Sequence, residues 1–132
     1  MTVAAALAAH PTPSPQQDLL AGAVQAALDC SQACTACADA CLSEGDVADM
    51  RRCVSTDLDC ADVCAVTARV LSRQTTRDTE VMRSLLVATI SATTTCGQEC
   101  ASHAEHHEHC RLCAEACRAC AQACRALLDS LV

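Results

Sequence analysis

Residues 110–124 read CRLCAEACRACAQAC, and this stretch decides the fold. Its cysteines stand three or four positions apart throughout, at Cys110, Cys113, Cys117, Cys120 and Cys124. Steps of three and four keep side chains on one face of an α-helix. They also fill successive a and d positions of a heptad, which point into the core of a helix bundle. The stretch therefore predicts a helix whose inward face is a row of thiols.

Three other segments carry cysteines with the same kind of spacing. These cysteines are Cys30, Cys34, Cys37 and Cys41, then Cys53, Cys60 and Cys64, then Cys96 and Cys100. The stepping also marks Asp57, which fills the gap in the second row, and His103 and His107, which continue the third row, as inward-facing. A buried carboxylate is costly unless it meets a metal or a hydrogen-bond donor, so Asp57 is a candidate ligand. We expect the four rows to meet along one axis.

Polar breaks divide the chain after Gln16 into four segments. The expected helices cover about 17–44, 47–72, 78–103 and 107–131. Gly45 can take the left-handed position that ends a helix, and Asp46 can cap the next one. Thr75 and Asp78 form a pair like a capping box. Short loops between long helices favour antiparallel neighbours, so we expect an all-α, up-down-up-down four-helix bundle with a cysteine-lined core.

The domain organisation follows from the position of the prolines, all of which lie within the first 15 residues. We expect residues 1–15 to form a flexible N-terminal arm and residues 16–132 to form a single domain. The start, residues 1–11, has no Lys or Arg and only a weak apolar stretch, so no secretory leader is expected. No apolar run approaches the roughly 18 residues of a membrane span. We therefore expect a cytoplasmic protein, in which clustered cysteines more often bind metal than form disulfides.

The composition limits both the core and the partners. The chain has 132 residues, 14 cysteines, no aromatic residue and a formal net charge of −7. Its core must therefore be built from Ala, Leu, Val and Cys. The acidic charge, with no Lys/Arg cluster, argues against a nucleic acid or a membrane surface as partner.

Alternating helix directions predict two different ends of the bundle. One end collects Glu44, Met50, His103, His106, His107 and His109. The other end collects Leu19, Leu20, Val70, Leu71, Val81, Leu85, Leu127, Leu128 and Leu131. We interpret the first end as a mouth through which metal passes, with Met50 at its surface or rim, and the second as a dry hydrophobic plug. Met82 is expected to fill core.

Copper(I) suits this arrangement of thiols best. Inward positions on one helix have Cβ atoms roughly 5–6 Å apart, and two sulfurs spanning a linear ion lie roughly 4.5 Å apart. Disulfides need closer Cβ atoms, and structural zinc sites are usually isolated tetrahedra on loops. Soft thiolates at low coordination number select copper(I). One monovalent ion per thiolate would also leave the interior nearly neutral, with a capacity of order ten or more ions.

The inward heptad cysteines, the lack of aromatics and the segment 103–110, HAEHHEHC, resemble the bacterial copper storage proteins of the cytosolic type. The resemblance covers nearly the whole chain from about Gln16. It implies a bundle filled with multiple thiolate-bridged copper(I) ions and assembled as a homotetramer. It matches His103, His107 and His109 to the histidines near the family's bundle opening. The expected metal ligands are Cys30, Cys34, Cys37, Cys41, Cys53, Asp57, Cys60, Cys64, Cys96, Cys100, His103, His107, His109, Cys110, Cys113, Cys117, Cys120 and Cys124.

Two other functions use related chemistry. A metallothionein-like zinc or cadmium buffer would lose its fold when the metal is removed, whereas a heptad bundle should stay helical. An iron–sulfur protein usually carries its cysteines in loops with a Cys-Pro ending, which this sequence lacks. An enzyme is not expected, because no nucleophile, base and orienting group can be assembled.

Overall fold

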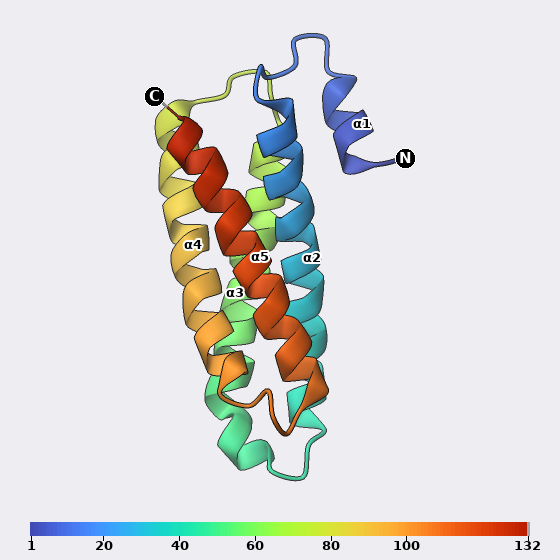
Figure 1. Ribbon diagram of the computed structural model, residues 1–132, viewed down its shortest axis with the longest axis vertical. Coiled ribbons are helices and arrows are strands. Elements are labelled where there is room, and N and C mark those ends of the chain that lie inside the picture. The colour runs from blue at the N-terminus through green and yellow to red at the C-terminus, as the bar shows by residue number, and fades with distance from the viewer. Residues whose placement is uncertain (132) are drawn as a thin grey trace.

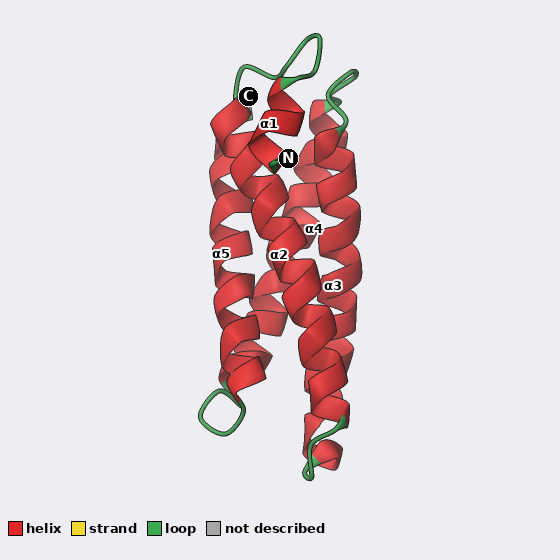
Figure 2. Cartoon of the chain, turned by 90° about the vertical axis from the view of Figure 1, so that its right-hand side faces the viewer, coloured by secondary structure: helices red, strands yellow, loops and turns green. Residues whose placement is uncertain are grey.

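The computed structural model describes residues 1–131 and is helical throughout (Figure 1). The elements are α1 (Val3–Ala8), α2 (Gln17–Leu42), the 3-10 turn η1 (Val47–Met50), α3 (Arg51–Ser72), α4 (Thr79–Ala101) and α5 (Glu108–Ser130). Helices α2 to α5 alternate in direction, running down, up, down and up in Figure 1, and pack as one bundle (Figure 1, Figure 2). The expected all-α four-helix bundle is confirmed, with helix ends within a few residues of the predicted ones. No helix in residues 1–131 is both long and apolar enough to cross a membrane.

The helix ends differ from the predicted capping in three places. Asp46 precedes η1, but its side chain makes no cap hydrogen bond. No glycine has a positive φ, so Gly45 does not take the left-handed position that was expected of it. Asp78 is itself the N-cap of α4 and accepts the backbone N–H of Val81 at 3.0 Å, rather than pairing with Thr75 in a capping box. The residue with a positive φ is Arg77, at 50°. A carboxylate cap satisfies an otherwise unpaired helix N–H, so one acidic residue is enough to start α4.

The core consists of layers along the bundle axis. Leu20, Leu71, Leu86 and Leu127 are at most 2% exposed and close one end. Next to them lies a polar layer of Thr67, Thr89 and Thr93, which is also buried. The cysteines fill the rest of the axis towards the other end. The plug is therefore confirmed for Leu20, Leu71 and Leu127. Leu86 is buried where Leu85 was expected, and Leu19 and Val81 are exposed and lie outside the plug.

Residues 1–15 were expected to form a flexible arm, and the structure instead places a short helix there, beside the upper part of α2 (Figure 1, Figure 2). Leu7 is 5% exposed and joins the core cluster. Gln74, from the loop between α3 and α4, donates to the Leu7 carbonyl at 2.9 Å and accepts from the Ser14 N–H at 2.8 Å. One buried amide thus ties the N-terminal segment to the bundle. The mobility of this segment stays a prediction.

Candidate metal centre

All the cysteines are buried, with exposed fractions of 1% or less, and all are free thiols. This confirms that the three-and-four stepping turns every cysteine inward. Each Sγ lies 3.6–4.0 Å from the Sγ of at least one other cysteine. Three thiolates bound to one ion at about 2.3 Å would lie about 4 Å apart, so the spacing suits three-coordinate ions without rearrangement. Linear ions would need the sulfurs to spread by roughly 0.5 Å or more.

Most cysteines form one continuous arrangement, the deep network. Its members are Cys30, Cys34, Cys53, Cys60, Cys64, Cys96, Cys100, Cys113, Cys117, Cys120 and Cys124. Two overlapping sets of four thiols, each with all sulfurs within 4.8 Å of one another, share Cys34 and Cys117. Their other members come from α2, α3, α4 and α5. An ion in one set can therefore share a sulfur with an ion in the next, which is the geometry of bridged clusters.

The remaining thiols, Cys37, Cys41 and Cys110, form a mouth cluster with His109. The Nδ1 atom of His109 lies 3.3 Å from Sγ of Cys37, 3.6 Å from that of Cys110 and 4.0 Å from that of Cys41. Thiol hydrogen bonds, above all with Cys100, lower the pKa of Cys37, and His109 adds to this effect. A thiolate beside an imidazole is a reactive metal ligand near neutral pH. The mouth cluster is thus suited to capturing an ion first.

Asp57 lies where the mouth cluster meets the deep network, in ligand sets that contain thiols of both. Its Oδ1 accepts thiol hydrogen bonds from Cys96 at 3.0 Å, Cys100 at 3.2 Å and Cys113 at 3.3 Å. Its carboxyl also belongs to one set of four possible ligands with Cys37 and to another with Cys53. The side chain is fully buried, and burial, followed by the Cys96 thiol, raises the pKa of Asp57 to about 12. The metal-free site therefore holds a neutral carboxyl that must lose its proton before it can bind a cation as a carboxylate.

His109 links the mouth cluster to the surface. Its Nε2 faces a Glu44 carboxylate oxygen at 3.4 Å, and its side chain is 24% exposed. Burial opposes its protonation, but the hydrogen bond to Cys37 and the charge of Glu44 outweigh this and raise the pKa of His109. The ring thus faces thiols with one nitrogen and an acidic surface with the other.

The other predicted histidines lie further out. His103 pairs with Glu99 through Nε2 at 3.4 Å. His107 pairs with Glu44 through Nδ1 and with Asp46 through Nε2, the latter at 3.2 Å, and its ring stacks on that of His109 at 5.5 Å between centroids. These pairings are with carboxylates, so His103 and His107 lie at the mouth end, as expected, but face carboxylates instead of thiols. The row fails here because α4 ends at Ala101 and the helical period ends with it.

Two features of the site differ from the sequence reasoning. Met50 was expected at the surface or rim, but it is fully buried because η1 folds it under the mouth. The threonine layer was missed, although stepping back from Cys96 by three and four reaches Thr93 and Thr89. The Thr89 hydroxyl lies 2.7 Å from that of Thr67 on α3 and donates to the Leu85 carbonyl. These hydroxyls are already satisfied, so they end the row of possible ligands.

Comparison with known proteins adds an independent observation. A family model described as copper storage protein matches residues 16–129. The copper storage protein Ccsp of Streptomyces lividans, in a structure loaded with 10 copper equivalents, is 52% identical, covers 98% of this chain and 100% of its own, and superposes with a TM-score of 0.95. A second structure of that protein, described as cytosolic and carrying five coppers, is 56% identical over 87% of this chain and 96% of its own, with a TM-score of 0.86. The Cu(I)-bound copper storage protein BsCsp3 is 31% identical over 80% of this chain and 94% of its own, with a TM-score of 0.72.

Proposed function

Because this chain belongs to the copper storage protein family, we propose that it stores many copper(I) ions along the axis of its bundle. The observation that carries this proposal is the continuity of the thiols. Each sulfur lies within 4.0 Å of another, and the possible ligand sets overlap instead of standing apart. Isolated sets would suit a few structural ions. Overlapping sets let sulfurs bridge, so that the number of ions approaches the number of thiols.

Charge neutrality supports monovalent cargo. The metal-free interior holds thiols and a neutral Asp57, with no buried basic residue among them. Each copper(I) ion that binds a thiol displaces about one proton, so filling leaves the net charge of the interior nearly unchanged. Divalent ions at the same ratio would leave a strongly positive interior, which burial makes costly. The capacity that follows is of order ten or more ions per chain.

We propose that copper enters at the mouth cluster and passes Asp57 to the deep network. His109 joins Cys37, Cys41 and Cys110 as the outermost inward-facing ligand, while His103 and His107 act at the rim. Asp57 serves as an oxygen ligand where the row of thiols is interrupted, once copper has replaced its proton. The cysteines of the deep network carry the bulk of the stored ions.

The biological setting belongs to the same proposal. The Streptomyces relative is described as cytosolic, and we propose the same location for this protein. We further propose that it acts as a store and not as an enzyme, and that it assembles as a homotetramer. Exposed apolar side chains on α2 and α3, including Leu28 and Leu58, offer surface for such an assembly. Light scattering coupled to size exclusion would give the mass directly.

Titration of the reduced, metal-free protein with copper(I) against bathocuproine disulfonate tests the proposal. We expect of order ten or more tightly bound equivalents per chain, with helical circular dichroism already present before any copper is added. Saturation at one or two equivalents would overturn the storage function in favour of a single structural or transfer site.

The route of uptake needs a separate pair of variants. His109→Ala should slow copper uptake in stopped flow while leaving the final capacity nearly unchanged, because it removes one ligand from the mouth and none from the deep network. His106→Ala is the matched control, since His106 is exposed on the turn that precedes α5. Equal uptake rates in both variants would exclude His109 from the route.

A further inference from the structure

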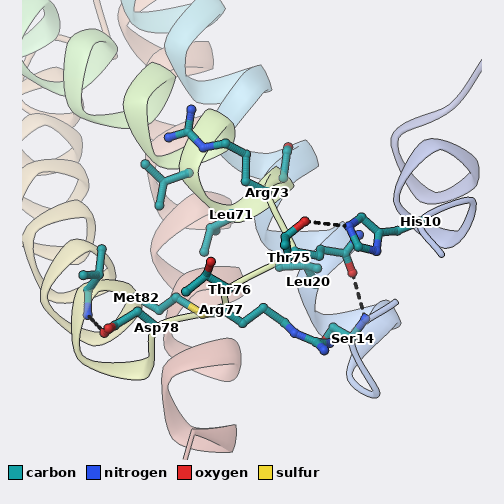
Figure 3. A pocket seen from close by; sticks show the side chains of 14 residues that line it. His10, Ser14, Leu20, Leu71, Arg73, Thr75, Thr76, Arg77, Asp78 and Met82 are labelled. Atoms are coloured by element: carbon teal, nitrogen blue, oxygen red, sulfur yellow. Dashed lines mark hydrogen bonds between the residues drawn. The ribbon is translucent and has the colours of Figure 1, made fainter. Parts of the chain in front are cut away.

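A pocket at the end opposite the mouth has no part in the copper site. It has a volume of about 570 Å³ and lies between the loop that joins α3 to α4, the start of α4 and the N-terminal segment (Figure 3). Its floor includes Leu20 and Leu71, which are 2% exposed and belong to the leucine layer that closes the bundle. The leucine and threonine layers therefore separate whatever occupies this pocket from the thiols.

Arg77 lines the pocket in an unusual conformation. Its φ of 50° lies in the left-handed region, which residues other than glycine rarely adopt and which costs backbone energy. Figure 3 shows the side chain running across the pocket, past Met82 and towards Ser14. Strained backbone of this kind is concentrated at ligand sites, where the cost is offset by the position it gives a side chain.

The guanidinium of Arg77 is partly buried. Its buried Nη1 has no hydrogen-bond acceptor within residues 1–131. The other buried atom without a partner in that range is Oε1 of Gln17, which does not line the pocket. A guanidinium is always charged, and a buried charged donor without an acceptor is strongly unfavourable. An anion in the pocket would supply the missing acceptor.

Several other polar groups of the pocket are already engaged, and Arg73 and Thr76 are exposed to solvent. Asp78 accepts the Val81 N–H as the cap of α4. His10 accepts the Thr12 N–H at Nδ1 and faces the Thr75 hydroxyl with Nε2 at 3.3 Å, so its ring closes the rim. Oε1 of Gln74 accepts from the Ser14 N–H and from the side chain of Gln17, the first residue of α2. Arg77 is thus the lining residue that has a buried donor without an acceptor in residues 1–131.

We propose that this pocket binds a small organic anion with an apolar body, its carboxylate on Arg77 and its chain against Leu20, Leu71 and Met82. A lining of apolar side chains with one oriented charged group is the usual form of a small-molecule site, and the volume lies within the range of about 300–1,000 Å³ found for such sites. A guanidinium fork matches a carboxylate in shape and charge. Asp78 repels an anion from the α4 side of the pocket, which directs the carboxylate towards Arg77.

Hexanoate is a suitable probe, because it combines a carboxylate with a short apolar chain. Carbon-13 methyl spectra of the reduced protein would report binding at Met82, with the buried Met50 methyl at the mouth as an internal reference. We expect a saturable shift of the Met82 signal with hexanoate, an affinity at least tenfold weaker for hexan-1-ol, which lacks the charge, and no shift of Met82 with inorganic phosphate, which lacks the chain.

The decisive variant is Arg77→Gly, which removes the guanidinium and places at φ 50° the residue that tolerates it best. Hexanoate affinity should fall roughly ten- to hundredfold, as expected for loss of a charge-assisted pair, while copper capacity stays unchanged. Arg73→Gln is the matched control, because it makes the same charge change on the same loop with a side chain that points away from Arg77 in Figure 3. Arg77→Lys gives a second test that keeps the charge and loses the fork.

Three results would overturn the proposal. The first is no saturable shift of the Met82 signal at hexanoate concentrations up to about ten millimolar, which is well above the dissociation constant expected of a specific small-molecule site. The second is equal hexanoate affinity in the wild type and Arg77→Gly, and the third is an equal loss of affinity in Arg77→Gly and Arg73→Gln. None of these results bears on copper storage, which the titration tests separately.

Discussion

The buried carboxyl of Asp57 makes the metal-free protein less stable as the pH rises. In the unfolded chain an aspartate has a pKa of about 3.9, whereas in the folded protein burial and the Cys96 thiol raise the pKa of Asp57 to about 12. Between these values the folded state keeps one proton that the unfolded state has lost. The free energy of unfolding then falls by about 1.4 kcal/mol per pH unit, or about 2.7 kcal/mol from pH 5.5 to 7.5.

Substituting Asp57→Asn isolates this effect, because the amide has the same shape and does not titrate. The raised pKa of His109 also favours folding at low pH, but both proteins carry it and it cancels in the comparison. Urea unfolding of the reduced, metal-free proteins, followed by helical circular dichroism, should show that the advantage of Asp57→Asn grows by about 2.7 kcal/mol between pH 5.5 and 7.5. Asp59→Asn, on the exposed side of the same helix, controls for the chemical change. Parallel pH profiles for wild type and Asp57→Asn would show that the folded state holds an ionised carboxylate, and the reasoning would fail.

Three further predictions test other parts of the structure. Gln74→Ala removes the amide that holds the N-terminal segment, so it should cost about 1–3 kcal/mol and speed hydrogen exchange in residues 1–15; unchanged exchange would contradict that role. Gly97→Val should lower the free energy of unfolding by about 1–3 kcal/mol, because a Cβ there lies 3.2 Å from a cysteine Cβ on α5; Gly22→Ala, with open space around it, should not destabilise the helix. Cys34→Ala should lower the copper capacity by about two or more equivalents, because the Cys34 sulfur contacts four others. Cys124→Ala should lower it by about one or fewer, because the Cys124 sulfur contacts one other. Equal losses of capacity would argue against bridging.

The sequence predicts the bundle and the inward cysteines because both depend only on helical period. Steps of three and four determine a face without any knowledge of neighbouring helices. Asp57 was placed by the same rule and is indeed buried. His103 and His107 lie at the predicted end but do not continue the row of thiols, because the rule holds only while the helix continues and α4 ends at Ala101.

Features that depend on distant contacts could not be predicted in this way. The packing of α1 rests on Gln74, which lies 67 positions beyond Leu7, and nothing local to residues 1–15 marks that partner. The division into a mouth cluster and a deep network depends on how far each helix is shifted along the bundle axis, which spacing within one helix does not determine. The burial of Met50 depends on a short 3-10 turn with no periodicity.

The overlapping ligand sets have a consequence for the lifetime of the protein in the cell. One set alone joins Cys30 and Cys34 of α2 to Cys60 of α3 and Cys117 of α5, so bridging ions would cross-link separate helices. A protease needs a helix to swing out before it can cut, and such local opening is governed by the contacts that must break. The empty chain is held by apolar packing and a few hydrogen bonds between elements, and the filled chain by many sulfur–metal bonds as well. Degradation would then remove copper-free molecules first. The amount of the protein would therefore follow the amount of copper without any change in its synthesis.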